Sequence, residues 1–244
     1  MASDDAVFPL PIMPALRQQR ASGRTGTPQE ETVEHHRCSR SRPPASPAVA
    51  STGVADPAPL GLAGFALTTF LLSVSNAGWM KAASGAAFLG YAFAYGGIAQ
   101  LLAGMWEFRN RNVFGATAFS TYGAFWIGLG LWVRWVLPTA HGVQGFRDVG
   151  WILLAFAIFN TYMLIISTQV NLAVFGVFVT LELTEIFLFI GNFTTTTGTG
   201  GMITAGGVMG VITALVAWYA SAAGVMNGHK GKTVLPVGGP LFNI

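Results

Sequence analysis

The protein chain has 244 residues, of which 52% are apolar and only 9% are charged, and its mean hydropathy is +0.54. Because a soluble domain carries roughly 25% charged residues, this composition excludes a water-soluble globular protein and indicates a membrane protein. The formal net charge of +3 comes without a basic stripe interleaved with aromatic residues, so we expect no nucleic-acid partner. The only cysteine, Cys38, has no CxxC or Cys/His spacing around it, so we expect no disulfide framework, metal site or cofactor.

Residues 1–55 are predicted to form a disordered cytoplasmic tail. They are rich in proline, serine, arginine and glutamate and have no helical or alternating apolar period, so they cannot bury enough surface to offset the entropy of ordering. Their apolar cluster at residues 7–14 is broken by prolines and lacks the continuous core of a secretory signal. We therefore expect no cleavage, and we expect the first membrane span to act as its own insertion signal.

The rest of the chain reads as apolar runs separated by short polar breaks, and a membrane span needs about 20 apolar residues. Six runs reach this length and predict an all-α membrane protein with a six-helix transmembrane domain at residues 56–228. The spans are expected at 60–79, 84–106, 113–133, 149–168, 172–191 and 202–226. A cytoplasmic C-terminal tail is expected at 229–244.

Six spans place both termini on one side of the membrane, and positive charges near the span ends indicate which side this is. The residues expected on the side of the termini are Arg40, Arg42, Arg109, Arg111, Lys230 and Lys232. Those expected on the other side are Lys81, Arg134 and Arg147. This excess predicts that both termini of a plasma-membrane protein lie in the cytoplasm.

The first span is expected to begin at an Asp-Pro-Ala-Pro sequence. Asp56 is the predicted N-cap and Pro57 the first helical position, since aspartate accepts hydrogen bonds from a first turn and proline lacks an N–H that would be unpaired there anyway. Pro59 and Gly61 follow. At the other end of the chain, Gly206 and Gly210 have the GxxxG spacing that is typical of close helix packing in membranes.

Polar side chains inside the predicted spans either pair between helices or line a wet cavity, because an unsatisfied polar group in hydrocarbon is costly. The candidates for a polar route are Thr68, Thr69, Gln100, Ser120 and Asn160. The alternative for each hydroxyl is a hydrogen bond to a carbonyl of its own helix.

Two glutamates, Glu182 and Glu185, fall inside the fifth predicted span. One charged residue at a helix centre costs roughly 2.5 to 3.5 kcal/mol on an insertion scale, so two of them demand a reason. Their spacing places them about 60° apart on one helix face, where like charges leave at least one protonated near neutral pH. The pair suits a proton relay; the alternative is that both stay neutral and bond to neighbouring helices.

The motifs of the common enzyme classes are missing from the sequence: it has no HExxH, GxSxG or GxxxxGK[ST], and no GxGxxG in a suitable context. A retinal pigment would need a lysine in mid-span, and Lys81 falls in a predicted loop. We therefore predict that the protein is not an enzyme.

Several stretches resemble signatures of the acetate uptake transporter family, also called the succinate-acetate permease or GPR1/FUN34/YaaH family. Residues 56–70, DPAPLGLAGFALTTF, are similar to its NPxPLGLxGFxxTT opening. Residues 95–100, 104–109 and 112–126 resemble its second signature, and the IGN at 190–192 and GKTVLP at 231–236 also fit. The resemblance extends from residue 56 to about 236 and leaves out the N-terminal tail.

The resemblance implies a six-helix protomer, assembled as a homo-hexamer, in which each protomer conducts acetate and similar small monocarboxylates, and in some members succinate. It leaves open whether the movement is coupled to protons or is that of a passive channel. It also implies a hydrophobic pore constriction of Phe65, Tyr122 and Leu181, the last placed by counting back from Gly191 and Asn192. Such a ring can pass a dehydrated small acid and stop bulk water.

Two features depart from the family pattern. Asp56 stands where the motif has asparagine, and Glu182 and Glu185 stand where the family is usually apolar or hydroxylic. Glu185 follows Leu181 by one helical turn and lies about 40° away around the helix, so it should face a pore that Leu181 faces. This predicts a carboxyl beside the constriction that exchanges a proton with passing acetate. The alternative is an ionised Glu185 that repels acetate and favours a cation.

Two other functions remain open on the sequence. One is a sensory or regulatory membrane protein that uses the N-terminal tail as an interaction segment. The other is an exporter of ammonium or another cation, which the acidic residues of the fifth span keep in consideration.

Overall fold

The computed structural model describes residues 53–80 and 87–242. Within these ranges the chain forms helices and no strand, and five helices are long and apolar enough to cross a membrane. A sixth, α4 (Val113–Leu131), has 19 residues. At 1.5 Å per residue it reaches about 28 Å, close to the thickness of the hydrocarbon core. The predicted all-α membrane fold is confirmed. Most of the predicted N-terminal tail, with Cys38, and the loop residue Lys81 lie outside the described residues.

The elements follow one another as α1 (Ala58–Asn76), α2 (Phe88–Phe93), the π-helix η2 (Ala94–Ala99), α3 (Gln100–Arg109), α4, the π-helix η3 (Trp132–Val136), the 3-10 helix η4 (Leu137–Thr139), α5 (Gln144–Ser167), α6 (Leu172–Thr194) and α7 (Gly201–Lys230). α2, η2 and α3 together make one continuous span.

Several helices extend beyond the predicted spans, α5 and α7 by the most residues. α5 begins at Gln144 rather than at residue 149, and α7 continues to Lys230 rather than ending at 226, two residues into the predicted C-terminal tail. An apolar run marks the part of a helix that suits lipid, whereas the helix itself continues as long as its hydrogen bonds can form. At the start of α5, Gln144 Nε2 donates to Asp148 Oδ1, four residues later, at 2.6 Å.

The start of α1 lies one residue later than the sequence predicted. Its N-cap is Pro57 rather than Asp56, because the first helical hydrogen bond runs from the Gly61 N–H to the Pro57 carbonyl at 3.2 Å. Asp56 Oδ1 still accepts from the Ala58 N–H at 3.0 Å. Pro59 lies in the first turn, where a missing N–H costs no helical bond.

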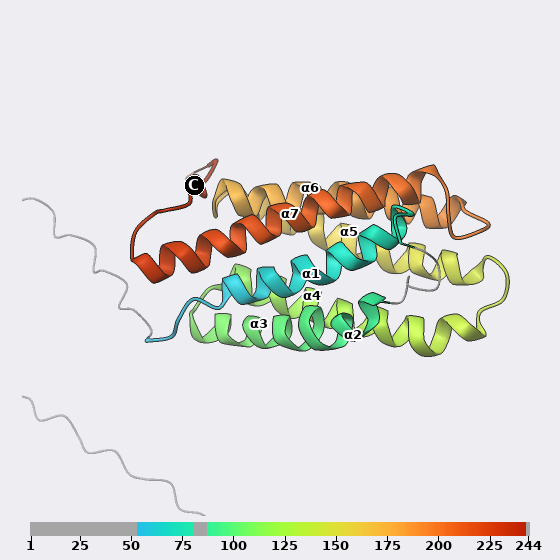
Figure 1. Ribbon diagram of the computed structural model, residues 1–244, viewed down its shortest axis with the longest axis horizontal. Coiled ribbons are helices and arrows are strands. Elements are labelled where there is room, and N and C mark those ends of the chain that lie inside the picture. Colours follow the sequence, from blue (N-terminus) through green and yellow to red (C-terminus); the bar gives the residue numbers. More distant parts are fainter. Residues whose placement is uncertain (1–52, 81–86, 243–244) are drawn as a thin grey trace, which may run out of the picture. The chain divides into compact units, whose positions relative to one another are not determined.

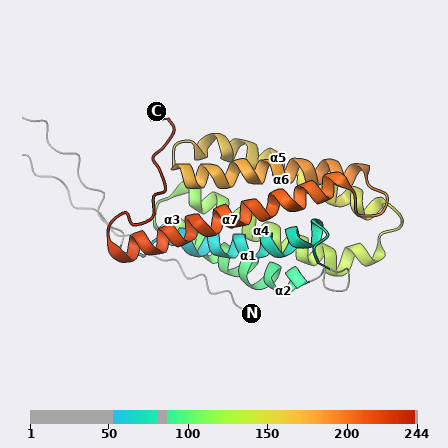
Figure 2. The ribbon, with the colours of Figure 1, turned by 45° about the horizontal axis from the view of Figure 1, so that its top comes forward.

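The spans run side by side (Figures 1 and 2), and the contacts between them close a ring of helices. α1 packs along α7, α7 along α6, and α6 along α5; on its other side α1 contacts η2 and α3, which pack on α4. Few contacts join α4 to α5, so the ring is most loosely closed there. The largest cluster of buried apolar side chains lies between these helices.

The chain after α7 returns to the beginning of α6. Asn227 Oδ1 accepts from the N–H groups of Val234 and Leu235 at 2.7 and 2.9 Å. The Ala173 N–H, in the first turn of α6, donates to the Val237 carbonyl at 3.0 Å. The C-terminal segment thereby satisfies a backbone group that the helix leaves unpaired.

Glycines bring α7 close to its neighbours. A Cβ atom added at Gly206 would lie 2.6 Å from the Leu188 side chain of α6, and one at Gly210 would meet Ser73 of α1. At Gly207 it would meet the backbone of Asn76 and Ala77 at the end of α1. The close packing predicted from the GxxxG spacing is therefore confirmed.

We predict that Gly207→Ala destabilises the protein by about 1–3 kcal/mol, because the added methyl group meets backbone that cannot move aside. Gly228→Ala, in the same helix, is the matched control, since a Cβ there meets open space. Thermal unfolding of the two variants in detergent measures the difference. Equal melting temperatures would contradict the close approach of α7 to α1.

Candidate functional site

Three cavities follow one another through the bundle. The first, which we call the vestibule, has a volume of about 290 Å³ and is bordered by Asp56, Asn112 and Asn171. These residues stand at the beginnings of α1, α4 and α6. The end of α7 lies on the same side, because Gly224 packs on Pro59 and the segment after α7 bonds to the start of α6. The vestibule therefore lies at the side of the bundle where α1 begins and α7 ends.

The second cavity, which we call the middle cavity, shares Phe65, Tyr122 and Leu181 with the vestibule. Its volume is about 40 Å³. This leaves room for roughly one or two water molecules. Thr69 and Glu185 also border it. The structure thus places the three predicted constriction residues between two cavities, and it places Glu185 on the face of α6 that Leu181 occupies, as their spacing predicted.

The third cavity, which we call the distal cavity, has a volume of about 240 Å³ and lies toward the other end of the helices. It is bordered by Asn76 at the end of α1 and Asn192 near the end of α6. It shares Leu72, Leu153 and Leu188 with the middle cavity. A second apolar ring therefore closes the middle cavity on its distal side.

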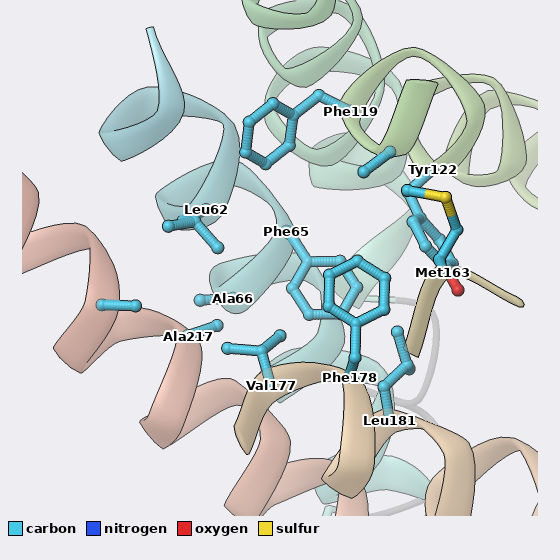
Figure 3. Packing of buried hydrophobic residues seen from close by; sticks show 12 residues of the cluster. Leu62, Phe65, Ala66, Phe119, Tyr122, Met163, Val177, Phe178, Leu181 and Ala217 are labelled. Atoms are coloured by element: carbon cyan, nitrogen blue, oxygen red, sulfur yellow. The ribbon is translucent and has the colours of Figure 1, made fainter. Parts of the chain in front are cut away.

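Aromatic packing stabilises the constriction that Phe65, Tyr122 and Leu181 form. The rings of Phe65 and Tyr122 meet edge to face with centroids 5.7 Å apart, which is a favourable geometry for two aromatic rings. Figure 3 shows Phe65 from α1, Tyr122 from α4 and Leu181 from α6 gathered in one cluster with Phe178. Each of the three ring residues is at most 6% exposed. Bulk water is therefore excluded between them.

Helix N-termini border the vestibule. Asn112 Oδ1 accepts from the Gly115 N–H at 3.1 Å, and Asn171 Oδ1 accepts from the Val174 N–H at 2.9 Å, so both asparagines cap their helices. The positive ends of the α4 and α6 dipoles thus lie at this cavity and favour an anion. Gln100, which is 1% exposed, also borders the vestibule, and its Oε1 atom has no hydrogen-bond partner among the described residues.

A chain of polar contacts joins the two glutamates of α6. Tyr122 Oη lies 3.1 Å from Asn160 Oδ1 and 3.4 Å from Glu185 Oε1. Asn160 Nδ2 donates to Glu182 Oε2 at 2.6 Å and to the Phe178 carbonyl at 3.0 Å. Glu182 and Glu185 are therefore linked through α5 and α4 rather than directly. The second oxygen of Glu185, Oε2, is buried without a hydrogen-bond partner among the described residues.

The structure brings only part of the predicted polar route to the cavities. Thr69, Gln100 and Glu185 border them. The predicted residues that are not among those bordering the three cavities are Thr68, Ser120, Asn160 and Glu182. Ser120 borders a separate cavity with Phe125 and Phe156. The substrate contacts at Thr68, Ser120 and Asn160 and the proton relay at Glu182 stay predictions.

Helix packing and the polar chain occupy these remaining side chains. Thr68 Oγ1 bonds to the Gly64 carbonyl at 3.1 Å and packs on Gly96, which is the alternative that the sequence allowed for hydroxyls. Ser120 packs on Gly104 of α3. Gly61 likewise packs on Phe119. These residues hold α1, η2, α3 and α4 together.

Sequence reasoning missed the second apolar ring and the buried state of Glu107. Leu72, Leu153 and Leu188 come from three different spans and have no signal that separates them from other leucines. Glu107 is fully buried and accepts from Asn110 Nδ2 at 3.3 Å. The two helix caps at the vestibule could have been found, since an asparagine directly before an apolar run is a helix-start signal.

Comparison with known proteins places these features in a family context. A model of the GPR1/FUN34/yaaH family matches residues 40–239. Ammonia transport outward protein 2 of Saccharomyces cerevisiae is 39% identical over 181 residues, which cover 70% of this chain and 61% of that protein. Acetate permease A of Emericella nidulans is 37% identical over 195 residues, which cover 75% of this chain and 65% of that protein. The match thus spans less than two thirds of these two relatives.

Bacterial relatives match over nearly their full length. The succinate-acetate/proton symporter SatP of Escherichia coli (strain K12) is 35% identical over 191 residues, which cover 77% of this chain and 97% of that protein. A solved structure of the bacterial acetate channel SatP superposes with a TM-score of 0.68 at 34% identity. It covers 76% of this chain and 99% of the channel, so the two share their fold.

Proposed function

Because the chain belongs to the GPR1/FUN34/yaaH family, we propose that it carries acetate and similarly small monocarboxylates, with succinate as a further candidate, across a plasma membrane. Two relatives, acetate permease A and the SatP symporter, are named for these substrates. The proposed route runs within one protomer, from the vestibule through the middle cavity to the distal cavity.

The row of cavities is the observation that carries this proposal. The vestibule lies at the beginnings of α1, α4 and α6, and the distal cavity lies toward their ends, so the two cavities approach the constriction from opposite sides. Helix dipoles at the vestibule favour the entry of an anion. The ionisable group at this mouth is Asp56, which accepts from the Ala58 N–H at the start of α1 and offsets part of that attraction.

The constriction acts as a filter in this proposal. Acetate is larger than the one or two waters that the middle cavity admits, so the rings of Phe65 and Tyr122 have to give way as it passes. The apolar side chains of the constriction cannot replace the hydration shell of a solute. Only a small acid with few polar atoms can therefore cross the constriction at a modest desolvation cost. Thr69 and Glu185 offer polar atoms directly beyond it.

Glu185 supplies the proposed proton step. Glu185 borders the middle cavity, where a passing carboxylate has to come close to it, and its Oε2 atom has no hydrogen-bond partner among the described residues. When Glu185 carries a proton, it can donate a hydrogen bond to acetate or pass the proton to it. When Glu185 is ionised, like charge repels the anion. Transport is therefore expected to be fast at acidic pH and slow at alkaline pH.

Assembly and orientation complete the proposal. We propose a homo-hexamer with both termini in the cytoplasm. On the outer face of α5 and α6, exposed Thr161 donates to Glu182 Oε1 at 2.9 Å. Such a polar pair is costly against lipid, and a neighbouring protomer that covers this face removes the cost. Native mass spectrometry of the purified protein measures the number of copies.

Export of ammonium is the second candidate function. It is favoured by the carboxylate of Glu185 among the aromatic rings of the middle cavity, a combination that suits a small cation, and by the name of the yeast relative. A regulatory role remains a third reading. Uptake by protein that lacks residues 1–50 discriminates against it, because a transporter does not need its tail.

We predict that Leu181→Ala raises protein-dependent uptake of labelled acetate into proteoliposomes severalfold, because it opens the ring between vestibule and middle cavity. Val177→Ala is the matched control, one turn earlier on α6. Val177 borders the vestibule but is not among the residues that border the middle cavity. Excess unlabelled acetate should compete and ammonium should not. Competition by ammonium instead, or equal rates in the two variants, would contradict the proposed route.

We predict that Glu185→Gln folds and assembles normally but loses the dependence of acetate exchange on pH, measured at equal pH on both sides of the membrane. The amide keeps a donor and cannot ionise, so exchange at alkaline pH should stay near the acidic rate. Glu107→Gln is the control, since Glu107 is a buried carboxyl that is not among the residues bordering the three cavities. A pH dependence that survives in Glu185→Gln would rule out the proton step.

A further inference from the structure

The direction of the Asn160 amide follows from its partners. One end of the amide contacts Glu182 Oε2 and the Phe178 carbonyl, which is an acceptor only, so this end is the NH₂ group. The other end is therefore the carbonyl oxygen, and it faces the hydroxyl of Tyr122 at 3.1 Å. Asn160 is 0% exposed, so no water competes for these contacts. Asn160 thus presents a fixed acceptor to Tyr122.

The Tyr122 hydroxyl has two oxygen neighbours and one proton to give. Its neighbours are Asn160 Oδ1 and Glu185 Oε1, at 3.1 and 3.4 Å. A tyrosine hydroxyl donates one hydrogen bond and can accept another. If Glu185 carries a proton, it donates to Tyr122 Oη, and Tyr122 donates to Asn160, so all three groups are paired. If Glu185 is ionised, it needs the tyrosine proton itself, and Asn160 loses its donor.

We propose that the Tyr122 hydroxyl reports the proton on Glu185 to the constriction, donating to Asn160 when Glu185 is protonated and to Glu185 when it is ionised. Asn160 is the positioning residue of this switch, and Glu182 holds its amide in place. The inference deepens the proposed transport function and rests on it. Its consequence is that one of the three constriction residues changes partner at each proton transfer.

Few other ionisable groups face Glu185. Tyr122 of α4 and Glu182 of α6 interact with it electrostatically, and Tyr162 of α5 interacts with Tyr122. The described helices α1 and α7 contribute hydroxyl groups at this level, Thr69 and Ser73 from α1 and Thr213 from α7, which bonds to Thr184. The remaining ionisable groups of α5, Arg147 and Asp148, lie near its start at Gln144.

The switch predicts that substitutions of Asn160 and of Tyr122 shift the balance between protonated and ionised Glu185 in opposite directions. Asn160→Leu removes the acceptor that favours the protonated state of Glu185, so the ionised state becomes more stable relative to the protonated state. Tyr122→Phe removes the donor that the ionised state needs, and a hydrogen bond to a charge is worth more than one to a neutral group, so the protonated state gains. A mere loosening of the packing would not separate the two variants in this way.

The test follows the titration of Glu185 in the full-length protein by infrared spectroscopy. The band of its protonated carboxyl group is identified as the difference between wild type and Glu185→Gln. We expect Asn160→Leu to move the midpoint of this titration to lower pH by about one unit, and Tyr122→Phe to move it to higher pH. The double variant should match Tyr122→Phe, because Asn160 acts only through the hydroxyl.

Three results would overturn the inference: shifts of the same sign in the two variants, no shift in Asn160→Leu, or an equal effect of Asn160→Leu with and without the hydroxyl. If Asn160→Leu does not fold, an unchanged midpoint in Tyr122→Phe alone overturns it. The infrared titration needs no transport, so it separates failure of the switch from failure of the proposed function, which shows as absent acetate uptake by the wild type. Where uptake is present, its pH profile should move with the infrared midpoint in each variant.

Discussion

Every polar side chain between the membrane spans has to find its partner inside the protein, because hydrocarbon supplies none. Most hydroxyls meet this constraint locally, as Thr68 does with Gly64, or across a helix pair, as Thr184 does with Thr213. Some buried polar atoms have no hydrogen-bond partner among the described residues. Four of these atoms belong to residues that border the vestibule or the middle cavity, namely Thr69, Gln100, Trp126 and Glu185, and two belong to Glu107 and Ser120, which border neither. At the two cavities, water or a solute can complete the missing hydrogen bonds.

The same constraint gives the constriction a polar group as well as apolar surface. Tyr122 contributes its ring to the contact with Phe65 and its hydroxyl to the contacts with Asn160 and Glu185. One residue thus belongs both to the apolar ring that stops water and to the polar chain that reaches Glu182. The glycines of α7 support this arrangement from outside the cavity, since they let α7 hold α1 and α6 at close range. Packing, polar pairing and the filter depend on each other at this level of the bundle.

The sequence predicted much of the fold because apolar runs of sufficient length have few alternatives in a membrane, and the family signatures added the constriction residues. It also predicted that Glu185 shares the face of Leu181, since that follows from helix geometry alone. It did not separate Thr69 from Thr68: both follow Phe65 closely, and Thr68 packs on Gly96 and donates to the Tyr91 carbonyl through contacts with a distant segment. The π-helices and the link from Glu182 to Glu185 through Asn160 depend on contacts between distant segments, which no local pattern encodes.

We propose that a small carboxylate crosses each protomer past the constriction of Phe65, Tyr122 and Leu181, and that the neighbouring carboxyl of Glu185 carries the coupled proton. Uptake of labelled acetate into proteoliposomes of the wild-type protein, with and without an inward proton gradient, tests it most directly. Protein-free vesicles and a protonophore correct for the leak of acetic acid. We expect protein-dependent uptake that the proton gradient accelerates beyond the leak. Protein-dependent uptake that is indifferent to the gradient would contradict the proton step, and the absence of protein-dependent uptake would contradict the route itself.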